Sequence, residues 1–250
     1  MNHLKPLRPM LALVLVSALL LSACAQDDQV TRMQAALASP ERSAENKARD
    51  EARKPIESVQ FFGIETGDNV IDLIAAGGWF TEVLSAAVGP SGTVYAHNPP
   101  FLVQQEAETA LHARLGNVEA VHVALAEAGL VGTADAAVTA LNLHDIYNGY
   151  NGTPGGEAAA VGFLTAVHAA LKPGGVLGVI DHIGIEGQDN TALHRMLTQQ
   201  ARDALIKAGF TIEAESEILA NPADDHTKMV FDPTIRGTTD QFVIRARKPQ

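Results

Sequence analysis

Residues 72–84, DLIAAGGWFTEVL, decide the fold of this 250-residue chain. An acidic residue ends an apolar run, a loop of small residues with Gly77 and Gly78 at its end follows, and an amphipathic segment starts at Trp79. This pattern is typical of a buried strand that turns into a helix. Glycine lets a ligand approach the backbone closely, and the first N–H groups of a helix are free to bind it. The stretch therefore predicts a strand, a loop and a helix of the kind that lies beneath a nucleotide-like ligand.

Predicted strands and helices alternate from Pro55 to the end of the chain. Strands are predicted at 69–75, 92–98, 118–124, 134–143, 176–182, 211–219 and 239–248, and helices at 79–89, 101–116, 156–175 and 190–210. This alternation predicts an α/β fold in which helices cover both faces of a largely parallel sheet. Residues 55–250 are predicted to form one domain, and residues 24–54 a tether and a helix that is capped at Ser39 and ends before Pro55.

The amino terminus resembles a bacterial lipoprotein signal. Lys5 and Arg8 precede an apolar run over 10–21, and the run ends in Leu-Ser-Ala-Cys at Cys24. The resemblance implies that residues 1–23 are a signal peptide and that Cys24, the only cysteine, is lipidated. Several acyl chains would anchor the protein permanently to a membrane of the cell envelope, facing the periplasm. Ala25 follows the cysteine in place of aspartate, which by the same resemblance favours the outer membrane.

The charge of the chain argues against nucleic acid as a partner. The formal net charge is −11, and removal of Lys5 and Arg8 with the signal peptide takes it to −13. Such a charge repels phosphate backbones, and no basic stripe with interleaved aromatic residues offsets it.

Polar side chains gather at the predicted carboxyl ends of four strands. In parallel sheets ligands bind beyond these ends, at the point where the strand order reverses. The residues concerned are Asp72 with the loop 74–78, His97 with Asn98, His144 with Asp145, and Asp181 with His182. We expect these four strand ends to form the functional site.

The motifs VIDLIAAGGWFTE, GTVYA, ADAAVTALNLHD and LKPGGVLGVIDH, in this order, resemble the class I methyltransferases that bind S-adenosylmethionine. The resemblance covers about residues 40–248. It is closest to a bacterial subfamily of predicted, often exported methyltransferases, which end with N-P-x-D-D-H and then F-D-P-x-I-R-G-x-T-D-Q-F. Here the matching stretch is NPADDHTKMVFDPTIRGTTDQF at 221–242. The resemblance implies a Rossmann-like, seven-stranded, mostly parallel sheet with an antiparallel last strand, S-adenosylmethionine as cofactor, and a small-molecule methyl acceptor.

The same resemblance implies a set of cofactor-binding residues. They are Asp72, Ala76, Gly77, Gly78, Trp79, Asn98 and Leu125. The chain departs from the general family pattern at four positions. Ile74 stands where a glycine is usual and is not expected to adopt a positive φ, and Ala76 replaces a second glycine. Asn98 replaces the acid that accepts the ribose hydroxyls, and Ala124 the acid that contacts adenine. An amide in place of a carboxylate lowers the expected affinity by roughly tenfold.

Four residues are candidates for the chemistry. His144 lies where the family places acceptor-facing residues, Asp145 is adjacent to it, and His182 ends the next predicted strand. His226 lies in the polar loop ADDHT, which could close over the strand ends as a lid. A base is needed only if the acceptor must lose a proton, and histidine is suited to that role. Because neighbouring residues on a strand point to opposite faces, one member of each His-Asp pair is expected in the cleft. Each histidine could equally be a hydrogen-bonded structural residue.

Other readings stay open at this point. His144, His182 and His226 could bind a metal for hydrolysis, but the paired spacings of metal motifs are missing and no metal is expected. The remaining histidines, at 112, 122, 168 and 194, are interpreted as structural or surface groups. A non-catalytic envelope protein on the same scaffold is the main rival, because S-adenosylmethionine is made in the cytoplasm. NAD and flavin are not expected, since the loop lacks G-x-G-x-x-G.

Overall fold

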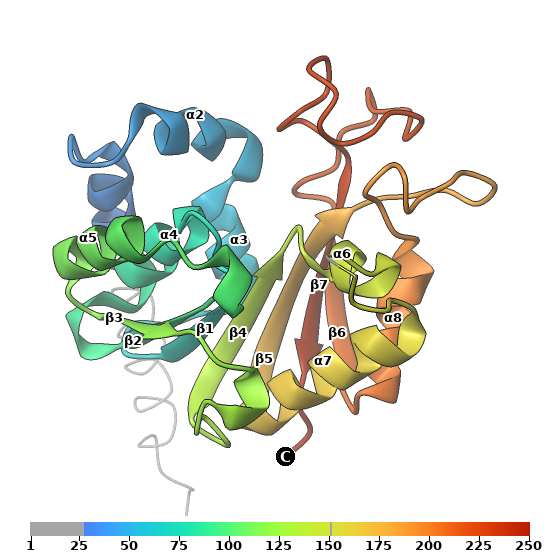
Figure 1. The fold of residues 1–250 in the computed structure, drawn as a ribbon. Helices are drawn as coiled ribbons and strands as arrows, with labels where there is room; N and C mark the ends of the chain where they lie inside the picture. Colours follow the sequence, from blue (N-terminus) through green and yellow to red (C-terminus); the bar gives the residue numbers. More distant parts are fainter. Residues whose placement is uncertain (1–27, 151) are drawn as a thin grey trace, which may run out of the picture.

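The computed structural model describes residues 28–150 and 152–250, and Figure 1 shows their arrangement. The predicted signal peptide over 1–23 and the predicted lipidation site Cys24 lie outside these residues. Among the residues described, none of the helices combines the length and the apolar character needed to cross a membrane.

Seven strands form one sheet in the order β3-β2-β1-β4-β5-β7-β6. Their bounds are β1 Asn69–Leu73, β2 Thr93–His97, β3 Val118–Val121, β4 Ala134–Ala140, β5 Leu171–His182, β6 Thr211–Ser216 and β7 Gln241–Arg247. The first five strands are parallel, and β7 runs antiparallel between β5 and β6. The predicted fold class, a mostly parallel sheet with an antiparallel last strand, is confirmed. The order reverses at β1, where β2 and β4 lie on either side.

Helices cover both faces of the sheet. They are α2 Ala44–Arg53, α3 Pro55–Phe62, α4 Trp79–Val88, α5 Gln105–Leu115, α6 Leu143–Asn148, α7 Glu157–Ala170 and α8 Thr198–Lys207, with short 3-10 turns at Gly89–Ser91, Pro100–Leu102 and Leu125–Glu127. Side chains alternate along each strand, so Val70 packs in the core beneath α3 and α4 and Ile71 in the core beneath α7 and α8. The sheet is therefore buried on both sides.

The amino-terminal segment packs against the domain. Residues 28–38 form a helix whose Gln29 amide donates to the carbonyl oxygens of Ile64 and Ala87, at 2.9 and 3.1 Å. The predicted cap at Ser39 is wrong: α2 begins at Ala44, and Ser43 Oγ accepts from Asn46 N at 3.0 Å. A serine four residues later thus satisfies the free N–H groups of the first helical turn.

The predicted helix over 190–210 is also wrong in its first half. The helix begins only at Thr198, and residues 183–197 form a loop in which Ile183 pairs with Met196. Arg195 in this loop is fully buried and binds Asp224 with two hydrogen bonds. This long-range pairing overrides a sequence whose local preference is helical.

Loops and one helix lie beyond the carboxyl ends of the strands. In Figure 1, α2 stands above one side of the sheet, and the loops over 183–197 and 221–240, drawn in orange and red, stand above the other. The strand ends predicted to carry the site therefore lie between these two groups of segments.

Candidate functional site

Two adjoining cavities lie at the carboxyl ends of the strands. The first, which we call the loop cavity, has a volume of about 760 Å³ and lies between the β1–α4 loop, the end of β2, α5 and α2. The second, the histidine cavity, measures about 240 Å³ and lies over the ends of β1, β4 and β5. Arg49 and the loop residues Ala75, Ala76 and Gly77 line both. The loop singled out by the sequence is thus the wall that the two cavities share.

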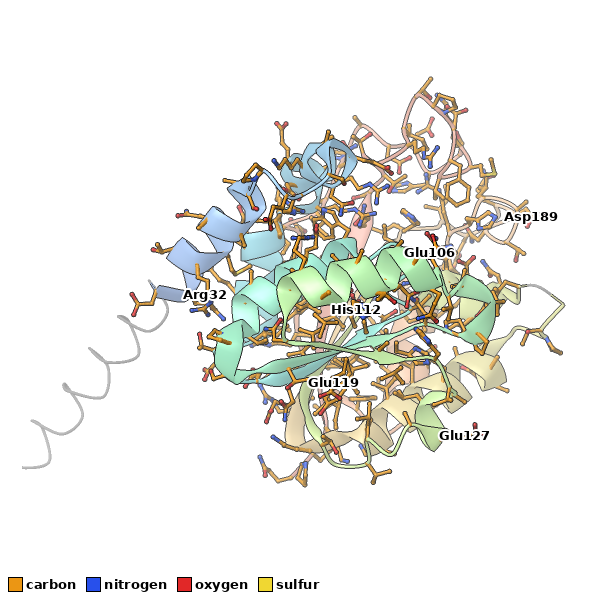
Figure 2. The ribbon with its side chains drawn as sticks, turned by 60° about the vertical axis from the view of Figure 1, so that its left-hand side comes forward. Arg32, Glu106, His112, Glu119, Glu127 and Asp189 are labelled. Carbon is orange, nitrogen blue, oxygen red and sulfur yellow. The ribbon has the colours of Figure 1, made fainter. Side chains whose placement is uncertain are left out.

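Figure 2 shows helix α5, which carries part of the lining of the loop cavity. Helix α5, on which Glu106 and His112 are labelled, lies over β2 and β3 and next to the amino-terminal helices. His112 itself lines the loop cavity, and residues of α2 line the opposite side of this cavity.

The β1–α4 loop adopts a strained backbone conformation. Ile74 and Ala76 have φ values of 56° and 49°, so the expectation that Ile74 avoids a positive φ is wrong. A left-handed conformation at a residue with a side chain costs about 1–3 kcal/mol, and it persists only where surrounding contacts hold it. Here Ala75 N donates to His97 O at 2.9 Å, and Asn142 Nδ2 lies 3.4 Å from Ile74 O.

Gly77 and Gly78 have different roles. A Cβ built at Gly77 would meet no atom within 4 Å, so this glycine opens directly onto the cavities. Gly78 has φ 76°, and a Cβ there would overlap the side chain of Leu111 on α5. The backbone conformation at position 78 therefore favours glycine. At position 77 the lack of a side chain leaves space in the two cavities.

Trp79 lies under α2 and leaves the loop cavity open. Its ring is 3% exposed, and its Nε1 donates to Asn46 O at 3.1 Å and to Asp50 at 3.0 Å. The guanidinium of Arg53 stands over the ring, 4.7 Å from its centre. Trp79 and Arg53 line the histidine cavity.

Asp72 supports the loop from below. It is 3% exposed and lines the histidine cavity, and Thr81 Oγ1 donates to its Oδ2 at 2.6 Å. Burial raises the pKa of Asp72 to about 6, although the Thr81 hydroxyl acts in the opposite direction.

Asn98 is already engaged by the protein. Its Oδ1 accepts from Ala76 N at 2.8 Å and its Nδ2 donates to Glu108 Oε1 at 3.0 Å. Glu108 also binds His122 Nε2 at 2.6 Å. Burial alone would raise the pKa of Glu108, but the hydrogen bonds that its carboxylate accepts outweigh this effect and lower the pKa. The Glu108 carboxylate of α5 thus binds the amide of Asn98, the residue at which the family resemblance implies an acid. Sequence reasoning missed Glu108, because nothing in a helical pattern shows that one of its carboxylates turns inward.

Leu125 lies apart from the other predicted cofactor residues. It is 7% exposed and belongs to the core beneath α7 and α8, and it lines neither cavity. Its 3-10 turn follows β3, which ends at Val121, earlier than predicted.

His144 lines the histidine cavity and forms a buried pair with Asp181. His144 Nδ1 lies 2.6 Å from Asp181 Oδ1, and the backbone N of His144 donates to Asp181 Oδ2 at 2.8 Å. Burial alone would lower the pKa of His144, but the carboxylates of Asp181 and Asp145 outweigh it and raise the pKa to about 10. Burial would raise the pKa of Asp181, but His144 lowers it. In the protein alone, the imidazole is therefore held as a cation.

His182 has the opposite character. Its ring centre is 5.5 Å from that of His144, and its Nδ1 contacts Thr239 Oγ1 at 2.7 Å. Burial lowers the pKa of His182 to about 4, although the carboxylate of Asp181 opposes this. His182 is thus neutral at physiological pH and tied to the segment before β7.

Asp145 also lines the histidine cavity, and His194 lies next to Asp145. Asp145 Oδ1 lies 3.2 Å from His144 Nε2 and 3.2 Å from His194 Nδ1. The sequence predicts His194 as a structural or surface group within a helix. It instead lies in the loop before α8, with φ 53° and its ring 5.1 Å from that of Phe231. The polar stretch EGQDN over 186–190, which contains a glycine, indicates a loop but does not reveal where that loop ends.

His226 does not join the other histidines. Its Nε2 contacts Asp240 Oδ2 at 2.9 Å, and it lines neither cavity. The metal site considered from His144, His182 and His226 is therefore not formed. The reason is that the 221–240 loop is held by Asp224, which binds the buried Arg195, and this leaves His226 facing Asp240.

Comparison with known proteins gives a fold. No protein-family model matches the chain, and no curated protein is significantly similar to it in sequence. Among solved structures, an S-adenosylmethionine-dependent methyltransferase from Aquifex aeolicus superposes with a TM-score of 0.55 at 20% identity, over 80% of this chain and 97% of that chain. The chain has the class I methyltransferase fold.

Two further solved structures have a similar fold. A possible exported protein from Bordetella parapertussis superposes with a TM-score of 0.53 at 16% identity, over 81% of this chain and 68% of that chain. The [4+2]-cyclase SpnF gives a TM-score of 0.56 at 16% identity, over 79% and 81%. Because SpnF is named for a cyclisation, this fold alone does not determine the activity of a protein.

Proposed function

We propose that the protein binds S-adenosylmethionine in the loop cavity and methylates a small acceptor in the histidine cavity. The observation that carries this proposal is the shared wall: Ala75, Ala76 and Gly77 line both cavities. A volume of about 760 Å³ lies within the range of cofactor sites, about 300–1,000 Å³. The bound cofactor would supply a methyl group on a positively charged sulfur, which an acceptor lone pair can attack while the sulfur keeps the bonding electrons.

The chain's own residues would hold the cofactor through the strained loop and the end of β2. The open face of Gly77 allows close approach to the backbone. Asn98 Oδ1 uses one lone pair on Ala76 N and keeps a second for a ribose hydroxyl. Glu108, which lines the loop cavity, would supply the negative charge that Asn98 lacks.

The histidine cavity would hold the acceptor. Methyl transfer from a sulfonium depends chiefly on alignment of the acceptor with the methyl group. His144, Asp145 and His182 form a rigid polar wall for this purpose, since each is tied to a neighbouring element. Arg49 and Arg53 line the same cavity and would draw an acceptor with negative charge.

The rival function is ligand binding without turnover. It is favoured by the amide of Asn98, which is already hydrogen-bonded within the protein. It is also favoured by the proposed location in the cell envelope, because nothing here accounts for a supply of S-adenosylmethionine outside the cytoplasm. The same cavities would then bind a ligand or partner in the envelope.

Calorimetric titration with S-adenosylmethionine and S-adenosylhomocysteine tests the proposal. We expect both to bind, and Gly77→Leu to weaken binding at least about tenfold, because the new side chain enters the cavity that both ligands need. Gly162→Leu is the matched control, since Gly162 is an exposed glycine of α7 with open space around it, and this variant should bind as the wild type does. Absence of binding heat at millimolar ligand would support the rival.

We also propose that Cys24 carries lipid and anchors the protein to an envelope membrane, the outer membrane being favoured by Ala25. The support is the resemblance of residues 1–24 to a lipoprotein signal.

A further inference from the structure

His144 has a buried nitrogen without a partner. The side chain is 3% exposed, its Nδ1 is bound to Asp181, and its Nε2 has no hydrogen-bond partner among the residues that the structure describes. Asp145 approaches this nitrogen to 3.2 Å without the geometry of a hydrogen bond. Buried polar atoms are nearly always satisfied, so an unsatisfied one at a cavity wall points to something bound there.

Three potential ligand atoms surround the same point. Asp145 Oδ1 lies 3.2 Å from His144 Nε2 and 3.2 Å from His194 Nδ1, and one ligand atom from each of the three residues falls within 4.8 Å of the others. Ligand atoms about 2.0–2.1 Å from a metal are separated by about 3.0 Å at octahedral and about 3.4 Å at tetrahedral angles. The two distances of 3.2 Å lie between these values.

We propose that His144, Asp145 and His194 bind a divalent transition-metal cation such as Zn²⁺. Two imidazoles and one carboxylate are the ligands of catalytic zinc and of other late transition metals, whereas Mg²⁺ and Ca²⁺ prefer oxygen alone. The site differs from the one considered from the sequence: His194 takes part, and His182 and His226 are bound to Thr239 and Asp240 instead.

The surroundings of the three residues fit a metal centre. The Asp181 carboxylate accepts from His144 Nδ1 and orients the ring, as outer carboxylates do for histidine ligands of zinc; the metal cation would take the place of the proton on Nε2. His194 has φ 53°, and strained backbone of this kind gathers at functional sites. The ring of Phe231 lies against His194 and limits its rotation.

Three protein ligands leave further coordination positions open. His144 and Asp145 line the histidine cavity, and Asp145 is half-exposed there, so the open positions face the place of the acceptor. This cation would favour an acceptor that offers an oxygen lone pair, such as a hydroxyl or a carboxylate. That last point rests on the proposed function, whereas cation binding does not.

The test is metal binding by the full-length protein in the absence of any methyl donor. The purified protein is incubated with Zn²⁺ or Co²⁺, freed of unbound metal, and analysed by elemental mass spectrometry; Co²⁺ also reports its ligands by visible absorption. We expect about one cation per chain, and at least about tenfold weaker binding in His194→Asn and Asp145→Asn. Asparagine tolerates the left-handed conformation at 194, so this variant should fold.

One control, one further variant and two outcomes make the test decisive. His112→Asn, which removes a half-buried histidine of α5 outside the site, should bind the cation as the wild type does. Asp181→Asn should weaken binding about 10–100-fold through the orientation of His144. The inference is overturned if the wild-type protein retains no cation, or if the variants at 145 and 194 bind the cation as tightly as the wild type does. Because S-adenosylmethionine binding is titrated separately, the failure of either proposal is distinguishable from the failure of the other.

Discussion

Asp72 shows how one buried carboxyl links the site to the stability of the fold. Its pKa in the folded protein is about 6, above the value of about 4 in an unfolded chain. The folded state therefore binds this proton more tightly. The stabilisation is fully present below about pH 4 and is lost as the pH rises through about 6.

Replacement of Asp72 by asparagine should remove this loss. The Thr81 hydroxyl can still donate to the new amide oxygen. We expect the unfolding free energy of Asp72→Asn, relative to the wild type, to rise by about 3 kcal/mol between pH 4 and pH 8, from 1.36 kcal/mol per pKa unit. Denaturant unfolding at both pH values measures it, with the exposed Glu119→Gln as control. A difference that does not change with pH would contradict the assignment.

At the scale of elements, one ion pair joins the two loops above β5. Arg195 is fully buried; it binds Asp224 through Nη1–Oδ2 at 2.9 Å and Nη2–Oδ1 at 3.0 Å, and it donates to Ile183 O at 2.9 Å. Asp224 in turn accepts from Asp240 N at 2.8 Å. The loops over 183–197 and 221–240 are thus held as one unit beside the histidine cavity.

Removing one partner of this pair should be costly. Arg195→Met is expected to lower the unfolding free energy by about 3–5 kcal/mol, because it leaves a buried carboxylate unpaired. The double variant Arg195→Met/Asp224→Leu should lose less. Denaturant unfolding measures both, and Arg202→Met, which breaks the exposed pair with Glu215, should cost at most about 1 kcal/mol. Equal losses in the single and the double variant would contradict this account.

At the scale of the whole molecule, the first described residues and the cavities lie at opposite ends of the sheet. The helix over 28–38 starts beside Ile64 and Ala87, close to the amino end of β1, which begins at Asn69. The four residues from Cys24 to Asp28 span at most about 14 Å, at about 3.5 Å each. A lipid-anchored chain would therefore present its cavities away from the membrane.

Fractionation and fluorescence test this arrangement. The wild type should be found with membranes and Cys24→Ser in the soluble fraction or unprocessed. Trp79, the only tryptophan, lies under α2 at the end with the cavities. In vesicles with brominated lipid chains its emission should therefore equal that of the soluble variant. Quenching by the lipid, or membrane association of Cys24→Ser, would argue against this orientation.

Much of the architecture follows from local patterns in the sequence. The alternation of apolar strands and amphipathic helices beyond Pro55 is enough to predict the sheet, its two covered faces and the position of Asp72, Asn98 and His182 at strand ends. These features depend on residues close together in the chain, where the side-chain period and the helix caps act. His144, predicted at the end of a strand, lies instead in α6, because β4 already ends at Ala140.

Which of these side chains meet is a property of the tertiary structure alone. His194 reaches His144 because Arg195 pairs with Asp224, 29 residues away, and this pairing breaks a segment that is locally helical. Ile74 adopts its left-handed conformation because distant asparagines bind the loop around it. Interactions between residues far apart in the sequence have no period that a linear pattern can reveal, so the cavities and the arrangement of their histidines emerge only when the chain is folded.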